Sequence, residues 1–241
     1  MMGALLEGRP SEAEVLAEEV RRWFASHGSP ELGDTHRAGG LLQAAREKVG
    51  LGTVVGLLRD SPLDTAGRPI AARALLALAL AESGQIDEAS GLIEERSVNG
   101  FGDLPDDGAL PVAECAWSEA AALSGQERAA SILYDRMLRY SDLHQQTAGW
   151  YLGATARYLG LLSDALGRYE DADDWFARAE SEHTQVDSPT WLARGLLDWA
   201  ESRQRRGQID QARALATKAL DAIGDLELNV SRSRAQRILQ S

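Results

Sequence analysis

The chain contains few residues of several types, and each shortage excludes a class of protein. Its 241 residues include a single cysteine, Cys115, so neither a disulfide framework nor a cysteine metal cluster can be built. No segment is long and apolar enough to span a bilayer, and no basic stretch leads into an apolar core at the N-terminus. We therefore expect a cytoplasmic location. Only Lys48 and Lys218 among the 25 basic residues are lysines, a composition typical of a GC-rich bacterial genome.

Positive charge and strand-forming patterns are also scarce. The formal net charge of −12 argues against broad contact with nucleic acid phosphates or anionic membranes, because both need a positive surface. Alternating β-branched residues are absent, whereas alanine and leucine are abundant and aromatic residues make up 6% of the chain. We therefore expect an all-α protein without strands, with no direct nucleic acid partner and no membrane partner.

The sequence does contain an internal repeat. Six glycines recur about every forty residues, and each is followed five positions later by a small or β-branched apolar residue. Because glycine adopts the left-handed conformation without strain, it can end one helix and let the next begin. Hairpins of this size bury their apolar faces only by stacking on neighbours, which predicts an α-solenoid. The pairs are Gly8/Ala13, Gly50/Val55, Gly84/Ala89, Gly125/Ala130, Gly167/Ala172 and Gly207/Ala212.

One repeat domain is expected over residues 1–241. Its helices are predicted at 1–7, 10–27, 34–49, 51–60, 67–83, 85–96, 107–124, 126–140, 147–166, 168–184, 188–206 and 208–224, with a closing helix at 228–239. The hairpin repeats then lie near 1–27, 34–60, 67–96, 107–140, 147–184 and 188–224.

The first of these repeats is short, because Met1 lies only seven residues before Gly8. An incomplete repeat leaves an apolar face uncovered, so the sequence suggests either a piece of a longer protein or a homodimer through this truncated N-terminal repeat.

The sequence around Gly167 resembles the tetratricopeptide repeat. The matching residues are Leu159, Gly160, Tyr169, Ala172, Phe176 and Ala179. The third, fourth and sixth repeats match less well. They keep the alanine, as Ala89, Ala130 and Ala212, but have Ile93, Tyr134 and Ala216 at the position of Phe176. The resemblance implies a right-handed superhelix of helical hairpins, with helices longer than in the standard repeat because that period is about 34 residues.

A longer series of segments resembles the C-terminal helical region of large bacterial ATPase regulators, which are LuxR-type or cyclase-linked. The segments are Phe101–Asp107, Ala120–Gly125, Leu133–Asp135, Arg157–Leu162, Ala165–Arg168 and Pro189–Arg194. The resemblance implies a non-catalytic protein-interaction or sensor scaffold of a signalling or transcription regulator. No Gly-Lys dipeptide occurs, so the phosphate-binding loop of the ATPase is not in this chain. We expect a free-standing relative or a fragment of a larger regulator.

No catalytic constellation is apparent in the sequence. The four histidines fall in different repeats, and none has a second histidine or cysteine at helical metal-ligand spacing. The adjacent carboxylates Asp173 and Asp174 lie opposite Phe176 on the expected helix, which favours a solvated face over acid–base chemistry. We therefore expect no enzyme activity, no metal and no cofactor.

In tetratricopeptide arrays the first helix of each pair lines the concave groove, and the resemblance implies binding residues at the equivalent positions. These are Glu119, Arg157, Tyr158, Asp164, Arg194, Asp198 and Glu201. The polar segment 141–149 is expected to enter the longest helix and to be followed by two exposed aromatics, which adds His144, Trp150 and Tyr151. Aromatic and arginine side chains dominate binding hot spots because they combine large contact area with polar groups.

Two interpretations of these residues stay open. The first is that they bind a protein partner or peptide, while the alternative is a small-molecule inducer held in a pocket around Trp150 and Arg157. Trp150 and Tyr151 could also have no binding role and simply fill the gap between the fourth and fifth repeats.

Overall fold

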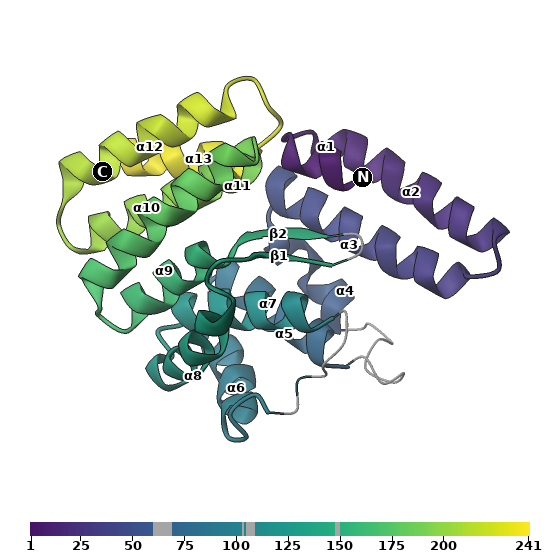
Figure 1. The fold of residues 1–241 in the computed structure, drawn as a ribbon, viewed down its shortest axis with the longest axis horizontal. Coiled ribbons are helices and arrows are strands. Elements are labelled where there is room, and N and C mark those ends of the chain that lie inside the picture. The colour runs from purple at the N-terminus through teal and green to yellow at the C-terminus, as the bar shows by residue number, and fades with distance from the viewer. Residues whose placement is uncertain (60–68, 103, 105–108, 148–149) are drawn as a thin grey trace. The chain divides into compact units, whose positions relative to one another are not determined.

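Helices account for most of the chain in the computed structural model, as the sequence predicts (Figure 1). The structure describes residues 1–59, 69–102, 104, 109–147 and 150–241. Its α-helices are α1 (Met2–Leu6), α2 (Pro10–Ser26), α3 (Pro30–Lys48), α4 (Val55–Arg59), α5 (Pro69–Glu82), α6 (Ile86–Ser97), α7 (Leu110–Leu123), α8 (Glu127–Met137), α9 (Thr155–Ala165), α10 (Tyr169–Gln185), α11 (Pro189–Arg205), α12 (Ile209–Ile223) and α13 (Asn229–Gln240). Part of the segment Phe101–Asp107, namely 103 and 105–107, lies outside the described residues.

The six predicted glycine turns are confirmed. All six glycines have φ between 64° and 87°, where residues with a side chain are strained. The turn at Gly84 shows the geometry, because the amide of Gln85 donates to the carbonyl of Leu80 at 2.9 Å and closes α5 before α6 begins. The apolar residue five positions after each glycine is buried in every repeat.

The prediction that the chain has no strand is wrong. Strands β1 (His144–Gln146) and β2 (Tyr151–Ala154) form a two-stranded sheet where a helix was expected from residue 147, and α9 begins only at Thr155. Gly153 has φ of 93°, which interrupts helical backbone. The hydroxyl of Thr155 donates to the carbonyl of Leu143 at 2.6 Å and accepts from Gln145, so side chains fix the strand pairing.

Other helix boundaries differ less from the prediction. The helix expected at 34–49 begins at Pro30, because Gly28 with φ of 80° ends α2 and proline at the first position suits a helix start. The helix expected at 51–60 is split into the 3₁₀ helix η1 (Leu51–Val54) and α4. A second 3₁₀ helix, η3 (Leu138–Tyr140), extends α8 to the predicted end.

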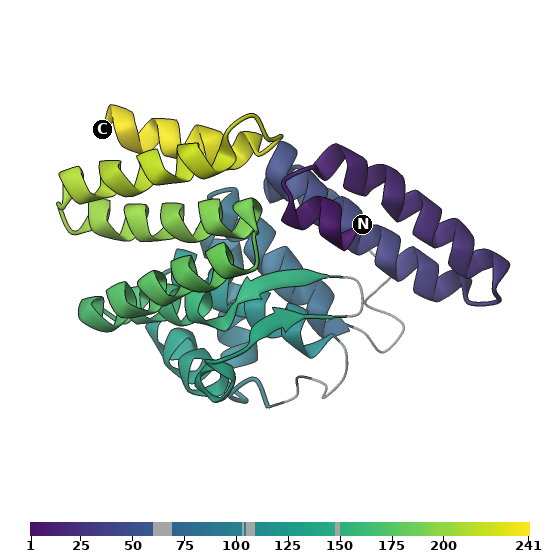
Figure 2. The same cartoon turned by 45° about the horizontal axis from the view of Figure 1, so that its top comes forward.

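The chain divides into two compact units, which are described separately. Unit 1 comprises Met1–Gly50, Gly149–Tyr151 and Glu180–Ser241, and unit 2 comprises Leu51–Ala148 and Leu152–Ala179. In unit 2 the first helices of consecutive repeats pack in order, with α7 against both α5 and α9. In unit 1, α2 and α3 form an antiparallel hairpin, while α11, α12 and α13 pack side by side (Figure 2).

The apolar residues of α1 are covered within unit 1, whereas Val15 and Trp23 of α2 in the same repeat are 60% and 56% exposed. Ala4 and Leu5 of α1 are buried, and α1 packs on α11. The hydroxyl of Thr190 donates to the carbonyl of Leu5 at 2.6 Å. The C-terminal helix α11 therefore covers part of the short first repeat.

Candidate functional site

Three of the predicted binding residues come together in the interior of unit 2 rather than on a groove. Arg157 of α9 donates from Nη2 to Oε2 of Glu119 of α7 at 3.0 Å, and its guanidinium lies 5.1 Å from the ring centre of Tyr158. The Tyr158 hydroxyl donates to the carbonyl of Leu152. Arg157 is only 2% exposed and Tyr158 is fully buried, so these side chains hold α7, α9 and β2 together.

Cys115 lies beside this cluster and is buried, as the sequence predicts. Burial raises the pKa of its thiol above the ordinary range. Burial likewise raises the pKa of Tyr158. Because a thiol must ionise to act as a nucleophile, Cys115 is chemically quiet in this environment.

The two aromatic residues of the expected hot spot pack inside unit 1. A Cβ on Gly39 would lie 1.7 Å from Cε2 of Trp150, so the indole lies directly on the backbone of α3. Tyr151, expected to be exposed, is buried; its ring meets Trp191 edge-on at 6.0 Å, and its carbonyl accepts from Gln43 at 3.3 Å. The pair therefore packs in the interior, but on the second and sixth repeats and not in the gap between the fourth and fifth.

The remaining predicted residues occupy helical positions in both units. Asp164 in the last turn of α9 and His144 of β1 are half-buried. Arg194, Asp198 and Glu201 share one face of α11, as their spacing predicts. Each of these three forms an ion pair with a residue of another helix, and the first of them is buried against α3.

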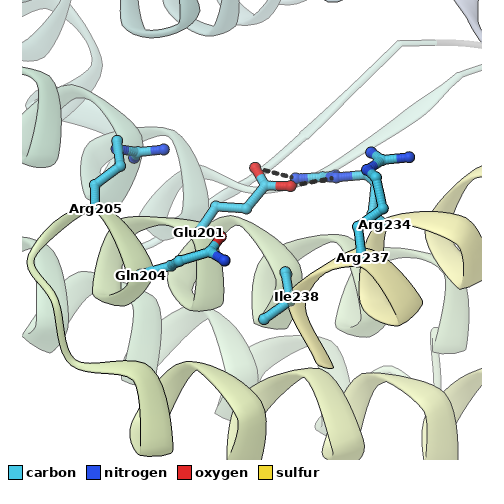
Figure 3. A pocket seen from close by; sticks show the side chains of 6 residues that line it. All are labelled: Glu201, Gln204, Arg205, Arg234, Arg237 and Ile238. Atoms are coloured by element: carbon cyan, nitrogen blue, oxygen red, sulfur yellow. Dashed lines mark hydrogen bonds and ion pairs between the residues drawn. The ribbon is translucent and has the colours of Figure 1, made fainter. Parts of the chain in front are cut away.

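The C-terminal half of this α11 face borders an open groove between α11 and α13. Figure 3 shows the lining side chains, of which three are arginines and one is a glutamate. The groove has a volume of about 220 Å³. It is lined by Glu201, Gln204, Arg205, Arg234, Arg237 and Ile238. One predicted site residue, Glu201, is therefore part of the groove wall.

Two carboxylates hold the guanidinium of Arg234 in the wall of the groove. Its Nε and Nη2 donate to the two carboxylate oxygens of Glu201, each at 2.9 Å, and Nη2 also donates to Asp198 at 2.8 Å. Burial lowers the pKa of the Arg234 guanidinium, whereas the nearby carboxylates of Glu201 and Asp198 raise it. The carboxylates have the larger effect, so the pKa lies well above the usual value. Asp198 and Glu201 therefore neutralise Arg234.

Sequence reasoning missed the partners of the α11 face. Glu47 pairs with Arg194, and Arg234 pairs with Asp198 and Glu201, across sequence separations that no local pattern reveals. The arginines of the closing helix were the available signal, since Arg234 and Arg237 are one helical turn apart and face the same side.

Neither a metal site nor a membrane-spanning helix is found in the part of the chain that the structure describes. Among the residues that the structure describes, no group of three histidines, cysteines or carboxylates could hold a metal ion. No helix of the described chain is both long and apolar enough to cross a membrane. The chain matches no protein-family model, no curated protein and no solved structure.

Proposed function

We propose that the chain is a non-catalytic scaffold that binds a protein partner through the faces of stacked first helices. The observation that carries the proposal is the in-order packing of first helices, α5 with α7 and α7 with α9 in unit 2, and α11 with α13 in unit 1. In a helical array, adjacent first helices form a continuous binding surface. The groove between α11 and α13 is one such place with charged side chains at its border.

The architecture in this proposal is a right-handed superhelix of tetratricopeptide-like hairpins. A contact between two repeat positions supports it, because a Cβ on Gly160 of α9 would lie 2.8 Å from the ring of Phe176 of α10. Glycine at this position therefore permits close packing of the two helices, as the resemblance implies. By the same resemblance, the scaffold belongs to a bacterial signalling or transcription regulator in the cytoplasm.

The state of the polar side chains supports binding rather than catalysis. The buried charges Glu119 and Arg157 neutralise each other, and the Cys115 thiol is held protonated by burial. A catalytic acid, base or nucleophile needs a perturbed group that a substrate can reach. Charged groups that a partner can reach line the groove of unit 1.

Site-specific photo-crosslinking in a lysate of the source bacterium tests the proposal. A photoreactive phenylalanine at Gln204 in the groove is compared with one at Thr217, which is exposed on α12. We expect a discrete polypeptide adduct from position 204 and none from position 217. No adduct at either position, together with a melting-temperature rise caused by a metabolite, would instead support the small-molecule receptor and overturn the scaffold.

A further inference from the structure

We propose that the groove between α11 and α13 binds an acidic peptide segment, with Arg237 and Arg205 each holding a different side-chain carboxylate of that segment. This inference rests on the proposed function as a protein-binding scaffold and names the chemistry of the partner. The two arginines come from different helices and border the same groove (Figure 3).

The charge of the groove is opposite to that of the chain as a whole. The formal net charge of the chain is −12, yet the groove is lined by Arg205 and Arg237 in addition to Arg234, whose charge Glu201 and Asp198 neutralise. Guanidinium groups recognise carboxylates through paired hydrogen bonds, which gives direction as well as attraction. An acidic segment is therefore attracted to this groove and repelled by most of the remaining surface.

Among the described residues that line the groove, Glu201 is the one carboxylate, and it is already engaged. Glu201 uses both oxygens on Arg234, at 2.9 Å each. Arg237 is exposed, and the described residues give it no hydrogen bond or ion pair. Its guanidinium is consequently available to an incoming carboxylate, while the Glu201–Arg234 pair keeps the wall of the groove rigid.

The size of the groove favours a side chain over an enclosed metabolite. Its volume of about 220 Å³ is below the range of about 300–1,000 Å³ typical of small-molecule pockets. Ile238 supplies an apolar contact for a methylene stem, while the amide of Gln204 already donates to the hydroxyl of Ser241. A glutamate side chain projecting from an extended peptide matches this combination of apolar contact and positive charge.

Fluorescence anisotropy with a fluorescein-labelled hexaglutamate peptide tests the inference on the full chain. We expect Arg237→Gln to weaken binding at least tenfold and Arg205→Gln/Arg237→Gln to abolish it. Arg213→Gln is the matched control, because Arg213 is exposed on α12 and its loss changes the net charge equally. We expect this control to change the affinity less than twofold. Since Arg237 is exposed, its replacement should leave the melting temperature unchanged.

Three results would overturn the inference. These are failure of hexaglutamate to bind, equal weakening by Arg213→Gln and Arg237→Gln, and displacement of the peptide by inorganic phosphate but not by unlabelled hexaglutamate. If hexaglutamate fails to bind but a protein still crosslinks to the first helices, only the inference about the acidic segment is lost. If no protein crosslinks at all, the scaffold proposal itself is wrong.

Discussion

Arg194 of α11 donates hydrogen bonds to the carboxylate of Glu47 of α3, a residue 147 positions earlier in the chain. Glu47 is 3% exposed and Arg194 is 7% exposed. The hydroxyl of Ser231 of α13 donates to the other oxygen of Glu47 at 3.3 Å, and the guanidinium lies 5.2 Å from the ring centre of Trp191. One buried carboxylate thus joins helices from the N-terminal and C-terminal parts of unit 1.

Removal of this carboxylate is expected to destabilise the protein strongly. Glu47→Ala leaves the Arg194 charge buried without its partner, which costs about 3–5 kcal/mol of unfolding free energy. Glu18→Ala is the control, since Glu18 pairs with Arg21 and Arg37 on an accessible surface and such pairs contribute at most about 1 kcal/mol. Urea denaturation measures both. Equal losses for the two variants would contradict the structural role of Glu47.

Replacing either of two glycines by alanine, one just before α6 and one within it, is expected to change the stability of the protein in opposite directions. Gly84 has φ of 80° and Gly91 lies within α6, and an added Cβ would meet nothing within 4 Å at either site. Gly84→Ala should therefore destabilise the protein by about 1–2 kcal/mol through left-handed strain alone. Gly91→Ala should stabilise it by about 0.5–1 kcal/mol, because alanine has the higher helix propensity. Thermal unfolding of both variants shows whether each substitution raises or lowers the melting temperature. A higher melting temperature for Gly84→Ala would contradict the left-handed turn at residue 84.

The Cys115 thiol is expected to make stability fall at alkaline pH. Burial raises the thiol pKa in the folded state, whereas the unfolded chain has the ordinary value of 9.0. Above pH 9 the unfolded state therefore binds fewer protons than the folded state, and the unfolding free energy decreases as pH rises.

Urea midpoints at pH 8 and pH 10 should differ less for Cys115→Ala than for the unaltered chain, because the substitution removes this contribution while buried tyrosines keep theirs. A thiol-reactive dye at pH 8 provides an independent measurement. It should label Cys115 in denaturant but not in the folded protein, and rapid labelling of the folded protein would contradict the burial.

The helices and turns were predictable from the sequence because their causes are local. A left-handed glycine such as Gly167 ends a helix through its own backbone freedom, and burial of Ala172 follows from the hairpin geometry. The pairing of β1 with β2 was not predictable in this way. Its pairing depends on contacts such as Gln145 with Thr155, and three- and four-residue strands have too short a pattern to recognise.

The candidate site was predictable only in part, because its geometry depends on distant residues. The spacing of Arg194, Asp198 and Glu201 correctly predicts a shared face of α11. Their surroundings depend on Glu47 and Arg234, which the fold brings from other helices. The same limitation led Arg157 to be assigned to a groove, although its ion pair with Glu119 lies in the interior.

The contact between Gly39 and Trp150 is expected to give a large coupling in a double-mutant cycle. A Cβ at residue 39 would overlap the indole, with Cε2 at 1.7 Å and Cζ2 at 1.9 Å. Gly39→Ala must therefore displace the ring, and overpacking of this kind costs about 1–3 kcal/mol. In the Trp150→Ala background the ring is gone, so the same substitution should cost almost nothing.

Urea unfolding of the two single variants and the double variant measures this coupling. A coupling above about 1 kcal/mol indicates that the Trp150 ring is committed to packing on α3, as its position against Gly39 implies. Additive losses would mean that the ring does not rest on Gly39 and would restore Trp150 as a candidate contact for a partner. Gly40→Ala is not a suitable control, because its Cβ would meet Met1, so Gly91→Ala serves as the unrelated glycine substitution.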